Sequence, residues 1–289
     1  MKIKMTDNPW DDIKRSAKLV TLPDAYLRLQ AILDKPDFAM DDVASAISQD
    51  PTITLRLLRI VNSSLYGFTK KIDTVSRAVA MLGTLQVHDL VLATSVAQSF
   101  KGMSSDIMNM QRFLRRSVYC AVASRKLVNL SSGCDKERVF VAGLLHDIGH
   151  LIMYRALPTL AQQVIITARA NDQPFYLVER ALFGFDYAWV GSKLMQEWSI
   201  PDSLCDITEH HVEPSIARRS QLETILIHLG SLMTRADDGE GVFNEGPLLA
   251  DPVCWEFIGC RPEDCISLVE QIKEETVEVL TLLFPNDAV

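Results

Sequence analysis

The sequence predicts an all-α fold, and three observations lead to this prediction. Apolar residues recur at helical spacing along most of the 289 residues. We find no sustained alternation of apolar and polar residues of the kind that marks strands. Proline and glycine fall between the periodic segments, as at Pro36, Pro51 and Gly67. We expect a globular multi-helix assembly rather than an up-down bundle, because the helices are short and the loops vary in length.

The first part of the chain contains five predicted helices. In the segment 22–33 the apolar side chains share one side, and Pro36 ends the helix. Asp50 and Pro51 mark a later helix start, since proline at the first helical position lacks only an N–H that has no partner inside the helix. The predicted helices are 22–33, a short helix opening at 41–42, 51 to the break at 67, 75–82 and 85–100.

The segment 101–106 is the best internal linker candidate, because it contains Gly102, Ser104 and Ser105. We therefore divide the chain into an N-terminal helical part (1–105), a second helical part (106–236) and a C-terminal helical extension (237–289). The predicted helices after the linker are 113–130, 136–154, 157–170, 175–183, 187–198, 202–211, 221–235 and 262–283.

The charge balance argues against two classes of partner. Lys and Arg number 29 and Asp and Glu 37, so the net charge is −8, which disfavours broad attraction to nucleic acid or anionic lipid. The longest apolar run, 139–145, is far shorter than the ~20 residues of a membrane span, and the N-terminus lacks the pattern of a signal peptide. We expect a cytoplasmic protein with no nucleic-acid and no membrane partner.

Four of the six histidines form two groups, which suggests a metal site. His146 and His150 lie in one group, with Asp147 beside the first, and His210 and His211 form the other. Imidazole nitrogen and carboxylate oxygen suit iron, manganese or zinc, and such an ion can convert bound water into a hydroxide nucleophile. A His-Asp pair on an apolar helix also occurs in buried polar networks, so both interpretations stay open at this point.

Two longer segments resemble a known family. The segment 141–150, VAGLLHDIGH, resembles the signature of the HD superfamily of metal-dependent phosphohydrolases. The segment 50–67, DPTITLRLLRIVNSSLYG, is similar to the signature of the HDOD domain, a divergent relative, and 72–100 follows the next helices of that family. The resemblance covers roughly 22–235. It implies a bacterial HDOD protein in which an N-terminal helical subdomain packs on a degenerate HD-like subdomain.

The resemblance also implies a metal site that this sequence retains only in part. In catalytic HD proteins a histidine on an earlier helix and an aspartate on a later one complete the site around the His-Asp pair. Arg116 aligns with the first position and Ser231 with the second, unless a register shift brings in His228. Arginine stays protonated and cannot ligate a metal. The candidate ligands that remain are His146, Asp147, His210 and His211. Tyr187 occupies a position where relatives with a second metal often carry histidine.

Arg116 has two interpretations. Its guanidinium takes the vacated metal position and pairs with Asp147, or its side chain points to solvent. Arg112, Arg115 and Arg116, at helical spacing, could also grip a phosphate or nucleotide, although a solvated helix face is the commoner case. We therefore take Arg116 and Tyr187 as the candidate ligand-binding residues.

Two function classes follow. The first is a non-catalytic signal-transduction or regulatory protein that binds a protein partner, or a nucleotide or other phosphate ligand. The resemblance implies signalling, because HDOD domains commonly occur beside signalling domains. The second is a metal-dependent phosphohydrolase or phosphodiesterase, which would require a divalent metal (Fe, Mn or Zn). Because two of the four core ligands are replaced, we expect the first class and no cofactor.

Overall fold

The computed structural model describes residues 9–17, 22–99, 109–131, 133–237 and 250–284, and the regular elements in these ranges are all helices. This confirms the all-α fold class. The predicted linker 101–106 lies outside the described residues. None of the described helices is long and apolar enough to cross a membrane.

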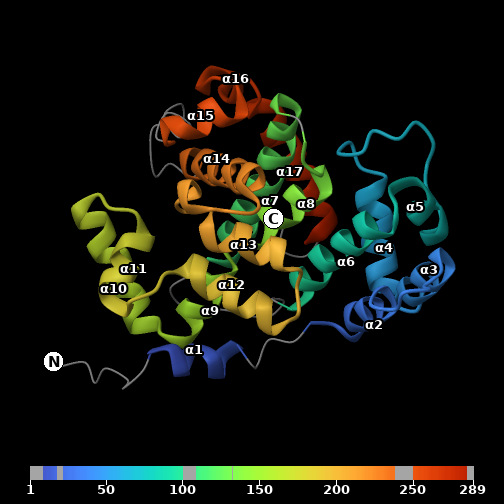
Figure 1. Ribbon diagram of the computed structural model, residues 1–289, viewed down its shortest axis with the longest axis horizontal. Coiled ribbons are helices and arrows are strands. Elements are labelled where there is room, and N and C mark those ends of the chain that lie inside the picture. The colour runs from blue at the N-terminus through green and yellow to red at the C-terminus, as the bar shows by residue number, and fades with distance from the viewer. Residues whose placement is uncertain (1–8, 18–21, 100–108, 132, 238–249, 285–289) are drawn as a thin grey trace.

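The N-terminal lobe consists of five helices and forms one side of the molecule (Figure 1). Its helices are α2 (Asp24–Leu33), α3 (Met40–Ser48), α4 (Pro51–Val61), α5 (Val75–Leu82) and α6 (Thr84–Ser99). Asp50 caps α4, since its carboxylate accepts hydrogen bonds from the backbone N–H groups of Thr52 and Ile53 at 2.9 and 3.1 Å. The predicted start of this helix is confirmed at Pro51.

Asn62 closes the loop that follows α4. Its side-chain amide donates to the carbonyl oxygens of Leu58 at 2.6 Å and Ile72 at 2.7 Å, and its side-chain oxygen accepts from the N–H of Ile72 at 2.7 Å. Gly67, inside this loop, has φ +60, a value that favours glycine. Asn62 therefore connects the end of α4 to the far end of the loop at Ile72.

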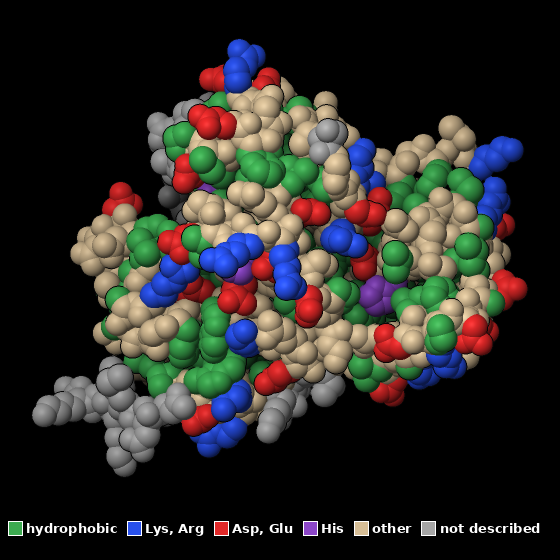
Figure 2. All heavy atoms as spheres, viewed as in Figure 1, with side chains coloured by type: hydrophobic (Ala, Val, Ile, Leu, Met, Phe, Trp, Pro, Cys, Tyr) green, Lys and Arg blue, Asp and Glu red, His purple; other side chains and the backbone are tan. Residues whose placement is uncertain are grey.

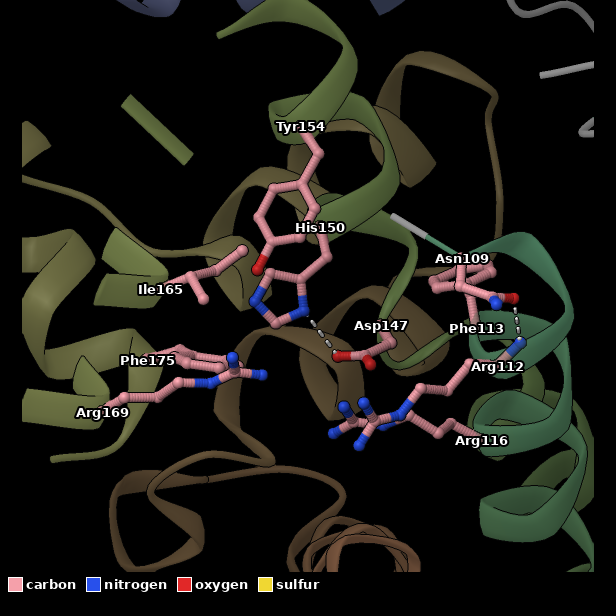
Figure 3. A pocket seen from close by; sticks show the side chains of 10 residues that line it. All are labelled: Asn109, Arg112, Phe113, Arg116, Asp147, His150, Tyr154, Ile165, Arg169 and Phe175. Atoms are coloured by element: carbon pink, nitrogen blue, oxygen red, sulfur yellow. Dashed lines mark hydrogen bonds and ion pairs between the residues drawn. The ribbon is translucent and has the colours of Figure 1, made fainter. Parts of the chain in front are cut away.

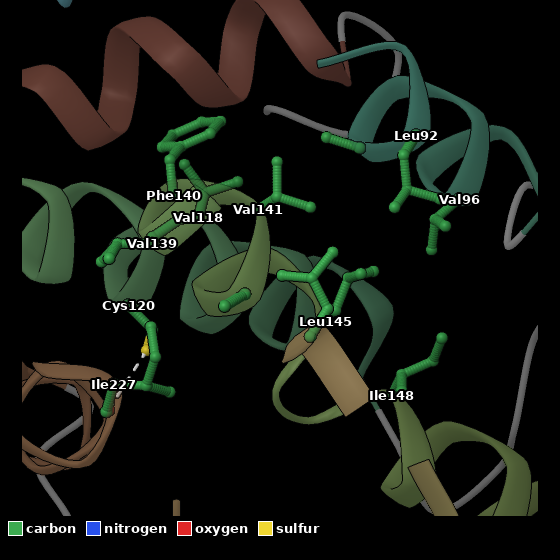
Figure 4. Packing of buried hydrophobic residues seen from close by; sticks show 14 of the residues in the cluster. Leu92, Val96, Val118, Cys120, Val139, Phe140, Val141, Leu145, Ile148 and Ile227 are labelled. Carbon is green, nitrogen blue, oxygen red and sulfur yellow. Dashed lines mark hydrogen bonds between the residues drawn. The ribbon is translucent and has the colours of Figure 1, made fainter. Parts of the chain in front are cut away.

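The body consists of six helices: α7 (Met110–Leu127), α8 (Lys136–Leu145), α9 (Ile148–Ala156), α12 (Tyr187–Glu197), α13 (Asp202–His210) and α14 (Gln221–Asp237). Its centre is α8, whose Val139, Phe140 and Leu145 are almost fully buried (Figure 4). A Cβ on Gly143 would lie 2.5 Å from the Cα of Ala121, so this glycine lets α8 cross close to α7.

Three further units surround the body (Figure 1). The α10–α11 hairpin, α10 (Pro158–Asn171) and α11 (Phe175–Phe183), projects from it and has a small core of its own, formed by Val164, Ala168 and Val178. The short helix α1 (Pro9–Ala17) places Trp10 against Trp189, with ring centroids 4.7 Å apart. The remaining α-helices are α15 (Pro252–Ile258), α16 (Pro262–Ile266) and α17 (Val269–Leu283), and two short 3₁₀ helices span Val128–Leu130 and Pro214–Ile216.

Polar contacts join the lobe to the body. The hydroxyl of Tyr66, in the loop after α4, donates to Glu137 of α8 at 2.9 Å, and Arg125 of α7 pairs with the same carboxylate at 3.3 Å. The helix α17 contacts both sides, since Glu275 pairs with Lys126 at 2.7 Å and Glu278 accepts from the N–H of Ser64 at 3.0 Å. One continuous hydrophobic core also runs through both parts.

The structure differs from the sequence prediction at five elements. The helix predicted from 51 to the break at 67 ends at Val61, where Asn62 begins the loop. The predicted helix 136–154 is broken at 146–147, where Asp147 leaves helical geometry (φ −100, ψ 4). The predicted helix 262–283 is two helices, because the chain turns between α16 and α17. The helices α1 and α15 were not predicted. Both are short, and α1 is held by tertiary contacts that its own polar sequence does not reveal.

Candidate functional site

The signature segment 141–150 forms a turn between two helices rather than one helix. The helix α8 ends at Leu145 and α9 begins at Ile148, which leaves His146 and Asp147 at the junction. A Cβ on Gly149 would lie 1.8 Å from the carbonyl oxygen of Tyr187, so the glycine allows α9 to pack directly against the backbone of α12. The junction is therefore buried against α12, and both signature side chains are directed into the body.

Asp147, His150 and Glu179 form a buried chain of charges. Nδ1 of His150 donates to the Asp147 carboxylate at 3.0 Å. Its Nε2 lies 3.3 Å from Oε1 of Glu179, within ion-pair range although not aligned as a hydrogen bond. The other Glu179 oxygen accepts from the N–H of Tyr187 at 2.8 Å. Glu179 is fully buried and the other two side chains nearly so.

The electrostatics of this chain favour an imidazolium between two carboxylates. Burial by itself would lower the pKa of His150, but the charges of Asp147 and Glu179 outweigh it and raise the pKa to about 9. Burial would likewise raise the pKa of Asp147, yet the cation of His150 holds it well below its usual range. His150 therefore supplies the positive charge that neutralises the signature carboxylate.

His146 and His211 lie beside this chain as neutral rings. Nδ1 of each donates to a backbone carbonyl in its own helical turn, Gly143 and Thr208 respectively, at 2.7 Å. Burial lowers the pKa of both imidazoles, which leaves each Nε2 as an acceptor. The ring centroids are 5.2 Å apart, and Nε2 of His211 accepts from the Tyr187 hydroxyl at 3.1 Å.

Tyr187 stacks on His150, with ring centroids 3.7 Å apart, and its hydroxyl is used by His211. The structure thus brings Tyr187 together with His146, Asp147 and His211. His210 is placed differently, because its Nδ1 faces Asp206 in its own helix, 2.8 Å from the carbonyl oxygen and 3.3 Å from the carboxylate. Its role as a ligand stays a prediction, but its contacts are outside the buried cluster.

The two positions that replace metal ligands make other contacts. The Ser231 hydroxyl donates to the carbonyl oxygen of His228 at 2.8 Å within α14. His228 in turn directs Nδ1 to the carbonyl oxygen of His211 at 2.8 Å. The contact with His211 explains the orientation of the His228 ring, which stabilises the turn after α13. The role of His228 as a metal ligand stays a prediction.

The residues of the site do not fit a divalent metal in this arrangement. His146 and His211 have the orientation of metal-ligating histidines, with Nδ1 fixed by a carbonyl. However, the carboxylate that would complete the set faces the His150 cation, and His211 Nε2 faces the Tyr187 hydroxyl. Within the described ranges, no group of three or more His, Cys, Asp or Glu side chains is arranged to hold an ion.

A pocket of ≈ 180 Å³ opens next to the buried cluster, between α7, α9 and the α10–α11 hairpin (Figure 3). Arg112 and Arg116 extend into it from α7, and Arg169 extends toward them from α10. Asp147 and His150 form the inner wall. The pocket is completed by Asn109, Phe113, Tyr154, Ile165 and Phe175.

The pocket refines both interpretations of Arg116. Its side chain is half-buried and lines the pocket, so it does not simply point to solvent, whereas Arg115 of the same helix is exposed. The positive charge of Arg116 contributes to the lowered pKa of Asp147, after the larger effect of the histidines. Among the described residues, Asp147 forms an ion pair with His150 at 3.0 Å, and the neutral ring of His146 lies 4.0 Å from its carboxylate. A direct pair between Arg116 and Asp147 stays a prediction.

Sequence reasoning missed several residues of the site. His150 was noted in the signature but not assigned as the partner of Asp147, although the i,i+3 spacing could have suggested it. Glu179, Arg169 and Phe175 were not singled out at all. They belong to the hairpin, which meets the signature only through the tertiary fold, so no local sequence pattern marks them.

Comparison with known proteins supports the resemblance seen in the two motifs. The model of the family described as HDOD domain matches residues 19–214. An uncharacterized protein of Treponema pallidum (strain Nichols) is 22% identical over 230 residues, which cover 78% of this chain and 44% of that protein. The chain therefore spans less than half the length of this relative.

Two crystal structures share the fold. A protein of Shewanella amazonensis SB2B, described as a candidate phosphohydrolase, superposes with a TM-score of 0.73 at 22% identity, over 94% of this chain and 97% of that one. A protein of Marinobacter aquaeolei VT8, described as a candidate signal transduction protein, gives a TM-score of 0.67 at 17% identity, over 98% of this chain and 62% of that one. At these identities the comparison establishes the fold alone.

Proposed function

Because this chain belongs to the HDOD family, we propose that it is a non-catalytic signal-transduction protein that acts by binding a protein partner or a small ligand. A structural neighbour described as a candidate signal transduction protein supports the signalling part of this proposal. The non-catalytic part depends on the site of this chain.

One observation carries the proposal: the signature carboxylate of Asp147 is neutralised by a side chain. Nδ1 of His150 lies 3.0 Å from this carboxylate. Glu179 lies beside the other ring nitrogen of His150, and the ring of Tyr187 stacks on the imidazole. A hydrolytic metal needs that carboxylate free, together with an open coordination position for water. A buried imidazolium in contact with it takes the charge role of the metal without its Lewis acidity.

The alternative is a metal-dependent phosphohydrolase. It is favoured by the orientation of His146 and His211, whose Nδ1 atoms are fixed by carbonyl oxygens, and by the structural neighbour described as a candidate phosphohydrolase. In that case His150 and Tyr187 would have to move away from Asp147 and His211 when the metal binds.

Metal analysis combined with activity assays tests the proposal. The full chain is purified without chelators and analysed for iron, manganese and zinc, then assayed for phosphatase and phosphodiesterase activity with added manganese or iron. We expect less than one equivalent of metal and turnover no higher than that of the Asp147→Asn variant, which controls for contaminating phosphatases. One equivalent of metal together with turnover that the variant loses would contradict the proposal.

A further inference from the structure

We infer that the outer face of α10 is a contact surface for a second copy of this chain, so that two copies pack α10 against α10 across a two-fold axis. The inference goes beyond the proposed function, because self-association neither requires nor excludes catalysis. The exposure of this face, its lack of charge and the kind of polar side chain on it support the inference.

The outer face of α10 is exposed and has one large apolar side chain at its middle. Ile166 is 61% exposed. Its neighbours on the helix surface, three and four positions away, include Gln162, Gln163 and Ala170, which are exposed as well. The opposite side of α10 packs on α9 and α11 and contributes to the small core of the hairpin. Exposed apolar side chains that occur singly are ordinary, so the surroundings of Ile166 decide what it indicates.

The hairpin around Ile166 is nearly uncharged, unlike the rest of the chain. Among the 22 residues of 157–178, the charged ones are Arg169 and Asp172, whereas charged residues make up 23% of the whole sequence. Arg169 extends into the pocket (Figure 3), and Asp172 lies at the turn after α10. In Figure 2 charged side chains are spread over the visible face, but the projecting hairpin at its left shows few of them. Depletion of charge is typical of the core of a protein interface.

The polar side chains on this face favour a second copy as the partner. With a net charge of −8, two copies repel each other, so self-association requires a contact surface without charge. Gln162 and Gln163 each carry both donors and an acceptor, so each can bond to an identical amide across a two-fold axis. A carboxylate or an ammonium group cannot do this, because it carries only acceptors or only donors. Among the described residues neither amide side chain has a hydrogen-bond partner. The face is therefore self-complementary, as a two-fold contact requires.

An exposed apolar side chain of α17 has the opposite surroundings. Val277 is 58% exposed, close to the value for Ile166. Its neighbours on the helix surface include Lys273, Glu274 and Glu278. Charged neighbours keep such a face in solvent, so Val277 provides a matched control for Ile166.

The position of α10 connects this contact to the buried site. The same hairpin carries Glu179, whose carboxylate lies 3.3 Å from Nε2 of His150. A second copy held on α10 therefore fixes the unit that completes the buried chain of charges. The contact places one such chain of charges on each side of the two-fold axis.

Sedimentation equilibrium of the full chain tests the inference, with circular dichroism as the check that each variant is folded. We expect the wild type to associate at micromolar concentrations to twice the 32.4 kDa mass of one chain. Ile166→Lys should raise the dissociation constant about a hundredfold or more, because two ammonium groups would meet at the axis. This variant also has less net negative charge than the wild type, so its weaker association would not be an effect of overall charge.

Val277→Lys introduces the same charge at a similarly exposed apolar position and should leave association unchanged. Mixing Ile166→Lys with Ile166→Glu is the most specific measurement. Each variant alone should be monomeric where the wild type is dimeric, and the equimolar mixture should form a dimer, because opposite charges then face each other. The inference is overturned if the wild type is a monomer or if Ile166→Lys and Val277→Lys weaken association alike. It is also overturned if the two Ile166 variants stay dimeric alone or do not pair when mixed.

Discussion

The N-terminal lobe and the body bury different kinds of side chain. Among the Asp, Glu, His, Lys and Arg side chains in the described part of the lobe, His88 is the buried one, and it lies 3.1 Å from Asp89, whose side chain is 14% exposed. In the body and the adjoining hairpin the corresponding group is larger and consists of Glu137, His146, Asp147, His150, Glu179, Asp186 and His211. Both parts contribute to one hydrophobic core, so the difference between them lies in the buried ionisable side chains and not in the apolar packing.

This difference shows where the fold carries a cost in stability. Burying a charge is unfavourable unless it is paired, and even a well-paired buried ion pair is often no more stabilising than an apolar replacement. The lobe largely avoids this cost and the body concentrates it around the signature turn. Buried ionisable clusters with shifted pKa values beside a cavity are typical of functional sites. The comparison therefore indicates that the functional site lies in the body and that the lobe has a structural role.

Removal of one charge from each part gives the sharpest test of this comparison. Asp147→Ala leaves the His150 cation buried with half of its partners, so we expect a loss of about 3 to 5 kcal/mol in the free energy of unfolding. Asp89→Ala removes the acid of the His-Asp pair in the lobe, where solvent is closer, and should cost about 1 kcal/mol. Urea unfolding measures both. Equal losses would show that the two parts do not differ in this respect.

Glycines in the two parts are also expected to differ. Gly149→Ala places a methyl group against the backbone of α12, which cannot yield as a side chain can, and should cost about 3 kcal/mol or more. Gly67→Ala, in the lobe, meets no close contact but strains a positive φ, at a cost of about 1 to 2 kcal/mol. The shift in denaturant midpoint at constant m-value measures each. A larger loss for Gly67→Ala would mean that α9 and α12 pack less closely than described.

The contact between the two parts can be weakened separately. Tyr66→Phe removes the hydrogen bond to Glu137, and we expect a loss of about 1.5 kcal/mol. The four tryptophans, Trp10, Trp189, Trp198 and Trp255, all lie outside the lobe, so fluorescence follows the rest of the molecule while circular dichroism follows all helices. The two unfolding curves should separate more in Tyr66→Phe than in the wild type. Lys70→Ala, exposed in the same loop, should change neither curve.

The smallest expected effect concerns the role of Arg116. Because His150 already forms the ion pair with Asp147, Arg116→Ala should cost about 1 kcal/mol, as for a half-exposed ion pair. A loss of about 3 to 5 kcal/mol would instead show that Arg116 forms a buried pair with Asp147. Thermal unfolding of this variant beside Arg115→Ala distinguishes the two outcomes.

Most of the fold could be predicted from the sequence because helical periodicity is a local property. The helix start at Pro51 and the helix 75–82 agree with the structure, whereas the predicted end at 67 does not, because the helix stops at Val61. The break at 146–147 could not be predicted, since the apolar pattern continues through it and the turn is imposed by packing of α9 against α12. The helix α1 was missed for a related reason, because its anchor is a tryptophan contact from a distant part of the chain.

The site was predictable only where its residues are neighbours in sequence. The signature motif led directly to His146 and Asp147, and the paired histidines led to His211, which the structure places beside them. Glu179 lies 29 residues after His150 and has no pattern that marks it, so the sequence does not indicate that His150 lies between two carboxylates, and Arg116 is the partner of Asp147 that the sequence suggests, beside the interpretation that it points to solvent. The helix that carries Glu179 is fixed by tertiary contacts, and its register relative to the signature is a property of the whole fold.

The helix α17 has a consequence for the order of folding during synthesis. Translation proceeds from the N-terminus, so α4 and α7 are complete well before α17 is made. Glu275 and Glu278 are among the groups that hold the lobe against the body, through Lys126 and Ser64. On the ribosome the two parts can each collapse early, but the contacts of Glu275 and Glu278 that join them form only when α17 emerges. A nascent chain stalled before residue 269 would contain both signature motifs but would lack these contacts between the lobe and the body.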